Sequence, residues 1–178
     1  MRLGWGYYFK LDELNQPANI RCLILACGNT LRSDDGVGPW LARWAEERFR
    51  SEPSVRIVSR QQWTPELAEE IAQSESVLFI DCSVHSDPGS VELNPVVPAS
   101  CTEGLATHHV GAAELLALSF ELYNSLPQNA MQLMVGAGST ELGETFSGQV
   151  AAALPQACSL IEETVASQLG NISGPRGV

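Results

Sequence analysis

The chain has 178 residues, a length typical of a single domain with a sizeable core. Hydrophobic residues make up 44% of it and charged residues 17%, a balance that favours a well-buried α/β domain. The formal net charge is −11, from ten basic and 21 acidic residues. This argues against nucleic acid or an anionic membrane as the main partner, because proteins that bind them carry basic patches.

The cysteines are odd in number and scattered, without C-x-x-C spacing: Cys22, Cys27, Cys82, Cys101 and Cys158. They form neither a disulfide framework nor a zinc motif, so we expect a reducing, cytoplasmic environment. No apolar stretch approaches the length of a membrane span, and no signal-peptide core is expected at the N-terminus. We expect an N-terminal extension over 1–19, a single α/β domain over 20–169 and a flexible tail over 170–178.

Strand and helix patterns alternate along the chain. The predicted strands cover 21–27, 54–59, 76–82, 90–94 and 131–137, and the predicted helices cover 35–49, 65–73, 110–124 and 147–167. The run from Cys22 to Ala26 is wholly apolar, as in a strand covered on both faces, and Asp87-Pro88-Gly89 predicts an antiparallel return at an edge. We therefore predict a three-layer α/β/α fold with a twisted, mostly parallel five-stranded sheet and one short antiparallel edge strand.

Helical spacing also predicts which faces are buried. The first helix is expected to bury Val37, Trp40, Leu41 and Trp44. The third helix is expected to bury Ala112, Leu116, Phe120 and Tyr123. Pro155 in the last helix predicts a kink or a later start for that helix.

An acidic pair follows the first predicted strand. After the Gly28-Asn29 turn come Asp34 and Asp35, at the start of a helix whose dipole favours negative charge there. The spacings of dinucleotide-binding loops and P-loops are absent, and two acids would repel a pyrophosphate. Two interpretations remain open: Asp34 simply caps the helix, or the pair includes a functional acid.

Further polar groups are expected at the same edge of the sheet. Asp81 ends the third apolar strand, and His108-His109 directly precede the third helix. With Asp35 they would form a three-ligand metal site that keeps open positions. Simple capping roles or an acid pair of the aspartic-protease kind are the alternatives, although the duplicated D-[TS]-G signature is missing. His85 is expected to be a loop residue.

At the level of whole motifs, the chain resembles the nickel-iron hydrogenase maturation endopeptidases. The resemblance is carried by GNTLRSDDGVG at 28–38, FIDCSV at 79–84, THHVG at 107–111, QQWTPELAEEI at 61–71 and ELGETFSGQVAAALPQA at 141–157. It covers about 21–167. Better-known members have a Gly-Gly-Thr-type turn where this chain has Gln61-Gln62-Trp63-Thr64, which indicates a different subgroup, such as one that serves soluble, bidirectional hydrogenases.

The resemblance implies an activity and a site. Members of the family remove a C-terminal peptide from the nickel-loaded precursor of the hydrogenase large subunit, and the nickel is carried by that substrate rather than by the free enzyme. The family's catalytic and metal-contacting residues correspond to Asp35, Asp81 and His108, since residues 108–111 fit H-x-x-G. The resemblance leaves open whether the peptidase is aspartic-type or nickel-dependent.

Beside these ligands we expect a substrate cleft formed by Gly28, Asn29, Asp34, Gln62 and Thr64. The alternative function is a non-proteolytic, metal-sensing binding protein or chaperone of the same fold.

Overall fold

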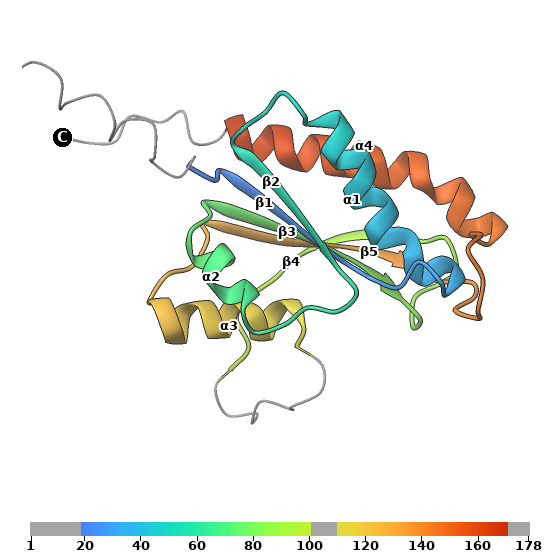
Figure 1. The fold of residues 1–178 in the computed structure, drawn as a ribbon, viewed down its shortest axis with the longest axis horizontal. Helices are drawn as coiled ribbons and strands as arrows, with labels where there is room; N and C mark the ends of the chain where they lie inside the picture. The colour runs from blue at the N-terminus through green and yellow to red at the C-terminus, as the bar shows by residue number, and fades with distance from the viewer. Residues whose placement is uncertain (1–18, 101–109, 171–178) are drawn as a thin grey trace, which may run out of the picture.

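A computed structural model of the chain describes residues 19–100 and 110–170 (Figure 1). The elements in chain order are β1 (Cys22–Cys27), the 3₁₀ helix η1 (Ser33–Gly36), α1 (Val37–Arg48), β2 (Val55–Arg60), α2 (Leu67–Ala72), β3 (Ser76–Ser83), β4 (Val91–Pro95), α3 (Ala112–Tyr123), β5 (Asn129–Gly136) and α4 (Gly148–Gly170). Nearly all of the expected N-terminal extension and of the expected tail lies outside the described residues.

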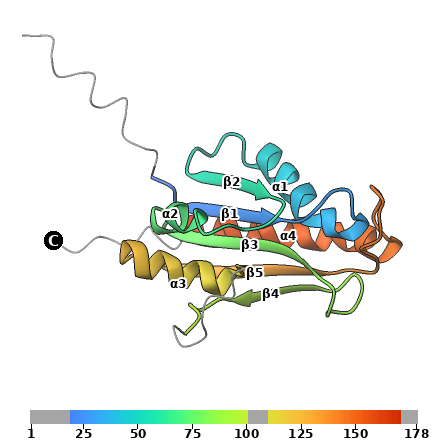
Figure 2. The ribbon, with the colours of Figure 1, turned by 60° about the horizontal axis from the view of Figure 1, so that its bottom comes forward.

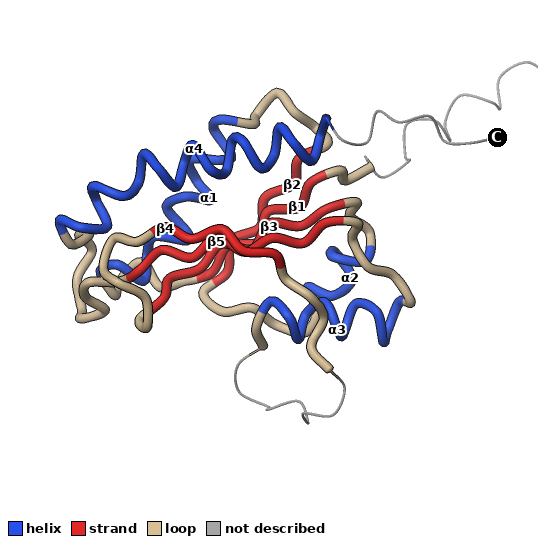
Figure 3. The backbone as a smooth tube through the Cα atoms, turned by 180° about the vertical axis from the view of Figure 1, so that it is seen from behind, coloured by secondary structure: helices blue, strands red, loops and turns tan. Residues whose placement is uncertain are grey.

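The strands form one sheet in the order β2-β1-β3-β5-β4, and only the β4–β5 pair is antiparallel (Figure 2). Helices α1 and α4 cover one face of this sheet, and α2 and α3 cover the other (Figure 3). The predicted three-layer α/β/α fold is therefore confirmed, together with its antiparallel edge strand. From β1 the chain crosses first to β2 on one side and then to β3 on the other, so the carboxyl ends of β1 and β3 flank a topological switch point, where open α/β sheets bind ligands.

Strand β1 is buried on both faces, as its apolar run predicts. Cys22, Ile24 and Ala26 belong to the core cluster under α1 and α4. The alternate residues Leu23, Leu25 and Cys27 belong to the cluster under α2 and α3. This alternation follows from the two-residue period of a strand and places Cys27 on the α2–α3 side.

Two of the expected helix faces are partly wrong. Phe120 and Tyr123 are 54% and 46% exposed, and α3 instead buries Leu115 and Ser119. Each step of four residues turns about 40° beyond a full circle of the helix. Two such steps separate Phe120 from Ala112, so Phe120 lies about 80° away and leaves the core face. Trp40 of α1 is likewise 40% exposed.

Helix α4 contains Pro155 and begins seven residues before it, so the proline does not mark the start of the helix. Among the helices within 19–100 and 110–170, none combines the length and apolar character needed to cross a membrane.

Close backbone contacts join the end of β1 to the helical segment that follows. A Cβ on Gly28, whose φ is +140°, would lie 1.9 Å from the carbonyl oxygen of Asp35, and one on Gly38 would lie 2.0 Å from that of Cys27. Only glycine permits either approach. These two contacts hold Cys27 and Asp35 in a fixed relation to each other.

Candidate functional site

A cavity of about 430 Å³ opens at the carboxyl edge of the sheet, between the end of β1 and the start of α3. Its described lining residues come from β1, η1, the loop after β2, β3 and the start of α3, and they are Cys27, Gly28, Asp35, Gln61, Gln62, Trp63, Asp81, Val110, Gly111 and Glu114. Five segments of the chain, spread from residue 27 to residue 114, therefore meet at the switch point between β1 and β3.

Asp35 is held in this cavity by the Gly-Asn turn. The backbone N–H of Asn29 donates a hydrogen bond to Oδ2 of Asp35 at 2.9 Å. The side-chain oxygen of Asn29 in turn accepts the N–H of Leu31 at 3.0 Å, which closes a short local turn. Asn29 thus orients Asp35 rather than lining the cavity itself.

Asp81 reaches the same cavity from the end of β3. Its Oδ1 accepts the backbone N–H of Cys82 at 2.7 Å, and the thiol of Cys27, on the neighbouring strand, lines the same cavity. Burial raises the pKa of Asp81 above its usual value; the bonds from Cys27 and Cys82 oppose this, and the negative charge of Asp35 adds to it. The structure therefore brings Asp35 and Asp81 together.

The charge of the cavity is one-sided. Glu114, at the start of α3, adds a third carboxylate, and the described lining includes no Lys, Arg or His. The three acids are half-buried, and a bound cation or the uptake of a proton would reduce the repulsion between their carboxylates. The arrangement can thus bind a cation or carry out acid–base chemistry.

The third predicted ligand, His108, lies outside the described residues, as does His109. Across 19–100 and 110–170, no three His, Cys, Asp or Glu side chains are grouped so that they could hold a metal ion. Two carboxylate ligands of the expected three are thus placed in the cavity. His85 is exposed in the loop after β3 and does not belong to the described lining.

Asp34, expected in the substrate cleft, has a different place. It is fully buried, and its carboxylate accepts backbone N–H groups of Gly138, Ser139 and Ser147 at 2.8, 2.8 and 2.7 Å. Burial alone would raise its pKa, but these three donors outweigh burial and lower it. Asp34 therefore ties η1 to the loop that leads into α4, and it does not line the cavity.

Of the remaining residues expected in the substrate cleft, two line the cavity and one does not. Gly28 and Gln62 line the cavity. Thr64 does not; it is exposed, and its hydroxyl donates to Glu66, which lowers the pKa of that carboxyl.

Motif spacing missed several groups of the cavity, namely Cys27, Gln61, Trp63 and Glu114. Trp63 is only 8% exposed and packs edge-on against Phe79, with ring centroids 5.3 Å apart. Its indole N–H finds no acceptor within the part of the chain that the structure describes. The available signal was weak: a large aromatic residue in a polar loop, beside the predicted Gln62.

No protein-family model and no curated protein sequence matches the chain. Among solved structures, the hydrogenase maturating endopeptidase HybD from E. coli is 23% identical, with 83% of this chain and 93% of that chain covered and a TM-score of 0.66.

Two structures from Thermococcus kodakarensis are similar as well. The [NiFe] hydrogenase maturation protease HybD is 26% identical over 81% of this chain and 98% of that chain, with a TM-score of 0.62. The maturation protease HycI is 23% identical over 83% and 93%, with a TM-score of 0.61. The chain thus has the fold of the hydrogenase maturation endopeptidases, and the resemblance that its motifs indicate to this family is confirmed.

Proposed function

We propose that the protein is an endopeptidase that removes the C-terminal peptide from the nickel-loaded precursor of a [NiFe]-hydrogenase large subunit. The observation that carries the proposal is the pair Asp35 and Asp81, which share one cavity whose described lining has no basic side chain. Similar structures that are themselves hydrogenase maturation proteases support the reaction class.

The nickel ion belongs to the substrate in this proposal. Asp35 and Asp81 offer carboxylate oxygens, and His108, two residues before the cavity residue Val110, offers an imidazole nitrogen. An O,O,N donor set suits a nickel(II) ion that keeps further ligands from the precursor. A precursor without nickel would lack these metal–ligand bonds, so it would bind more weakly and escape cleavage.

The electrostatics of the free protein support this order of events. Asp35 and Asp81 repel each other in the cavity, and burial adds to the cost of ionising Asp81. A divalent ion brought by the substrate offsets both penalties at once. The nickel-loaded precursor is therefore the form that the cavity should prefer.

The reaction itself is peptide hydrolysis. The oxygen of a water molecule bonds to the scissile carbonyl carbon, the C–N bond breaks, and the leaving amine takes up a proton. The side-chain amide of Gln62, which is exposed and lines the cavity, can hydrogen-bond the peptide backbone and orient it.

The test is mass spectrometry of the partner large subunit, produced with and without this protein and with and without nickel. We expect the mass of one C-terminal peptide to be lost only when both the protein and nickel are present. The His85→Ala variant serves as the control, since His85 is exposed and outside the described lining. Stable binding of nickel-loaded precursor without any loss of mass would instead support the non-proteolytic chaperone.

A further inference from the structure

Cys27 is a buried thiol at the proposed site to which the proposed reaction gives no role. It is the last residue of β1, and Asp81 lies beside it on β3, since the parallel register pairs Ala26 with Ile80 one residue earlier. Both residues line the cavity, and the parallel register places their side chains on the same side of the sheet.

The position of this thiol is fixed. Cys27 is only 8% exposed, and its carbonyl oxygen is packed against Gly38 so closely that a Cβ there would lie 2.0 Å away. A thiol carries one S–H group that can donate a hydrogen bond. A thiol whose position is fixed can orient the neighbouring group that accepts its hydrogen bond.

We propose that Cys27 is a positioning residue whose S–H group fixes the orientation of the Asp81 carboxylate. Asp81 then has two donors, the N–H of Cys82 on its own strand and the thiol from the neighbouring strand. Donors from two directions restrict the side-chain torsions of an acid. The inference deepens the proposed function and rests on it for the role of Asp81.

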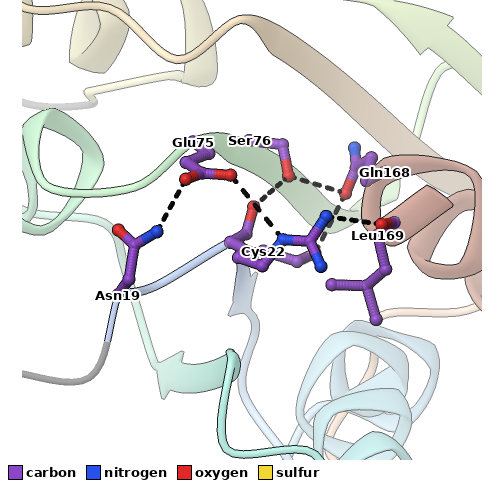
Figure 4. A network of polar contacts seen from close by, with 7 residues as sticks. Asn19, Cys22, Glu75, Ser76, Gln168 and Leu169 are labelled. Carbon is purple, nitrogen blue, oxygen red and sulfur yellow. Dashed lines mark hydrogen bonds and ion pairs between the residues drawn. The ribbon is translucent and has the colours of Figure 1, made fainter. Parts of the chain in front are cut away.

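A matched control lies at the other end of the same strand. Cys22 is also a buried thiol, and it donates to Oε1 of Gln168 at 2.9 Å, in the polar network at the amino edge of the sheet (Figure 4). Ser76 donates to the same oxygen at 3.1 Å. Cys22→Ala therefore removes a buried, hydrogen-bonded thiol from β1 without touching the cavity.

The experiment compares Cys27→Ala, Cys27→Ser and Cys22→Ala. Steady-state cleavage of nickel-loaded precursor should show kcat reduced about tenfold in Cys27→Ala, the equivalent of one buried hydrogen bond, with KM within about twofold of the wild type. Cys27→Ser keeps a donor and should restore kcat to within about threefold of the wild type. Cys22→Ala should lower the melting temperature and leave kcat unchanged.

A second measurement does not depend on activity. The carboxyl ¹³C resonance of Asp81, assigned by its loss in Asp81→Asn and recorded at one pH, should move in Cys27→Ala and stay in place in Cys22→Ala. If the wild type cleaves no precursor, the proposed function fails while this resonance still tests the contact. The inference is overturned by an unmoved resonance, by normal kcat in Cys27→Ala, or by a Cys27→Ser variant as slow as Cys27→Ala.

Discussion

Two neighbouring acids of one loop have opposite surroundings. The carboxylate of Asp34 is enclosed by three backbone N–H donors from the segment before α4. Asp35, the next residue, accepts the N–H of Asn29 and faces a cavity that it shares with Asp81 and Glu114. A buried acid whose lone pairs are occupied by the protein holds the fold together, whereas acids that face each other in a cavity are available to a ligand.

The largest expected effect concerns the cavity acids. Asp35→Asn and Asp81→Asn should each reduce precursor cleavage at least about a hundredfold, because each removes an anionic group of the proposed site. Shape is preserved, so the fold should survive. Cleavage rates measured beside circular dichroism spectra check this. If either variant processes nickel-loaded precursor normally, that acid has no part in the reaction.

The histidine pair gives the next contrast. We predict that His108→Ala abolishes processing and that His109→Ala and His85→Ala retain at least part of it. Consecutive residues point their side chains in different directions in strands and in helices alike, so adjacent histidines cannot easily replace each other as ligands. Processing rates and melting temperatures of the three variants distinguish a ligand from a residue that only supports the helix start. An inactive His109→Ala with an active His108→Ala would reassign the ligand.

Asp34 should behave in the opposite way. Asp34→Ala leaves three backbone N–H groups without their acceptor, so we expect a loss of ~3 kcal/mol in the free energy of unfolding. Urea denaturation measures this, with Asp35→Ala as the matched control, which should lose less than about 1 kcal/mol. Equal losses of unfolding free energy in the two variants would contradict the structural role that we assign to Asp34 alone.

The smallest expected effect is a pair of opposite pH dependences. The lowered pKa of Asp34 gives stability that is present above its ordinary value of 3.8 and lost as the pH falls through the lowered value. The raised pKa of Asp81 gives stability that is present below 3.8 and lost as the pH rises through the raised value.

Near neutral pH, Asp34→Asn should therefore be less stable than the wild type, and Asp81→Asn should be more stable. Both differences should shrink toward acid pH. Melting curves between about pH 3 and pH 7 check this, and two variants that change in the same direction would contradict it.

The sheet was predictable because its evidence is local. The apolar run of β1 and the turn Asp87-Pro88-Gly89 before β4 indicate burial and edge position within a few residues. The face of α3 was less predictable, since apolar residues such as Phe120 also occur on its exposed side. The residue type alone does not show whether an apolar side chain is exposed or buried.

Only those residues of the site that lie near the end of a predicted strand or the start of a predicted helix could be located from the sequence. Asp35 follows β1 and Asp81 lies near the carboxyl end of the neighbouring parallel strand β3, so the topology brings them together. The backbone groups that donate to Asp34 lie more than a hundred residues away in the sequence, and no local pattern indicates them. Cys27 looked like one more apolar strand residue, because its chemistry depends on what lies on the next strand.

The packing of Gly28 and Gly38 affects how a saturation library of this chain would be interpreted. The Cβ of any other residue at these positions would lie about 2 Å from a carbonyl oxygen. Replacements of either glycine should therefore lose as much activity as replacements of Asp35 or Asp81, in a selection for hydrogenase activity. Cellular abundance would separate the two groups. Glycine variants should disappear from the soluble fraction, while acid variants should accumulate as intact, inactive protein.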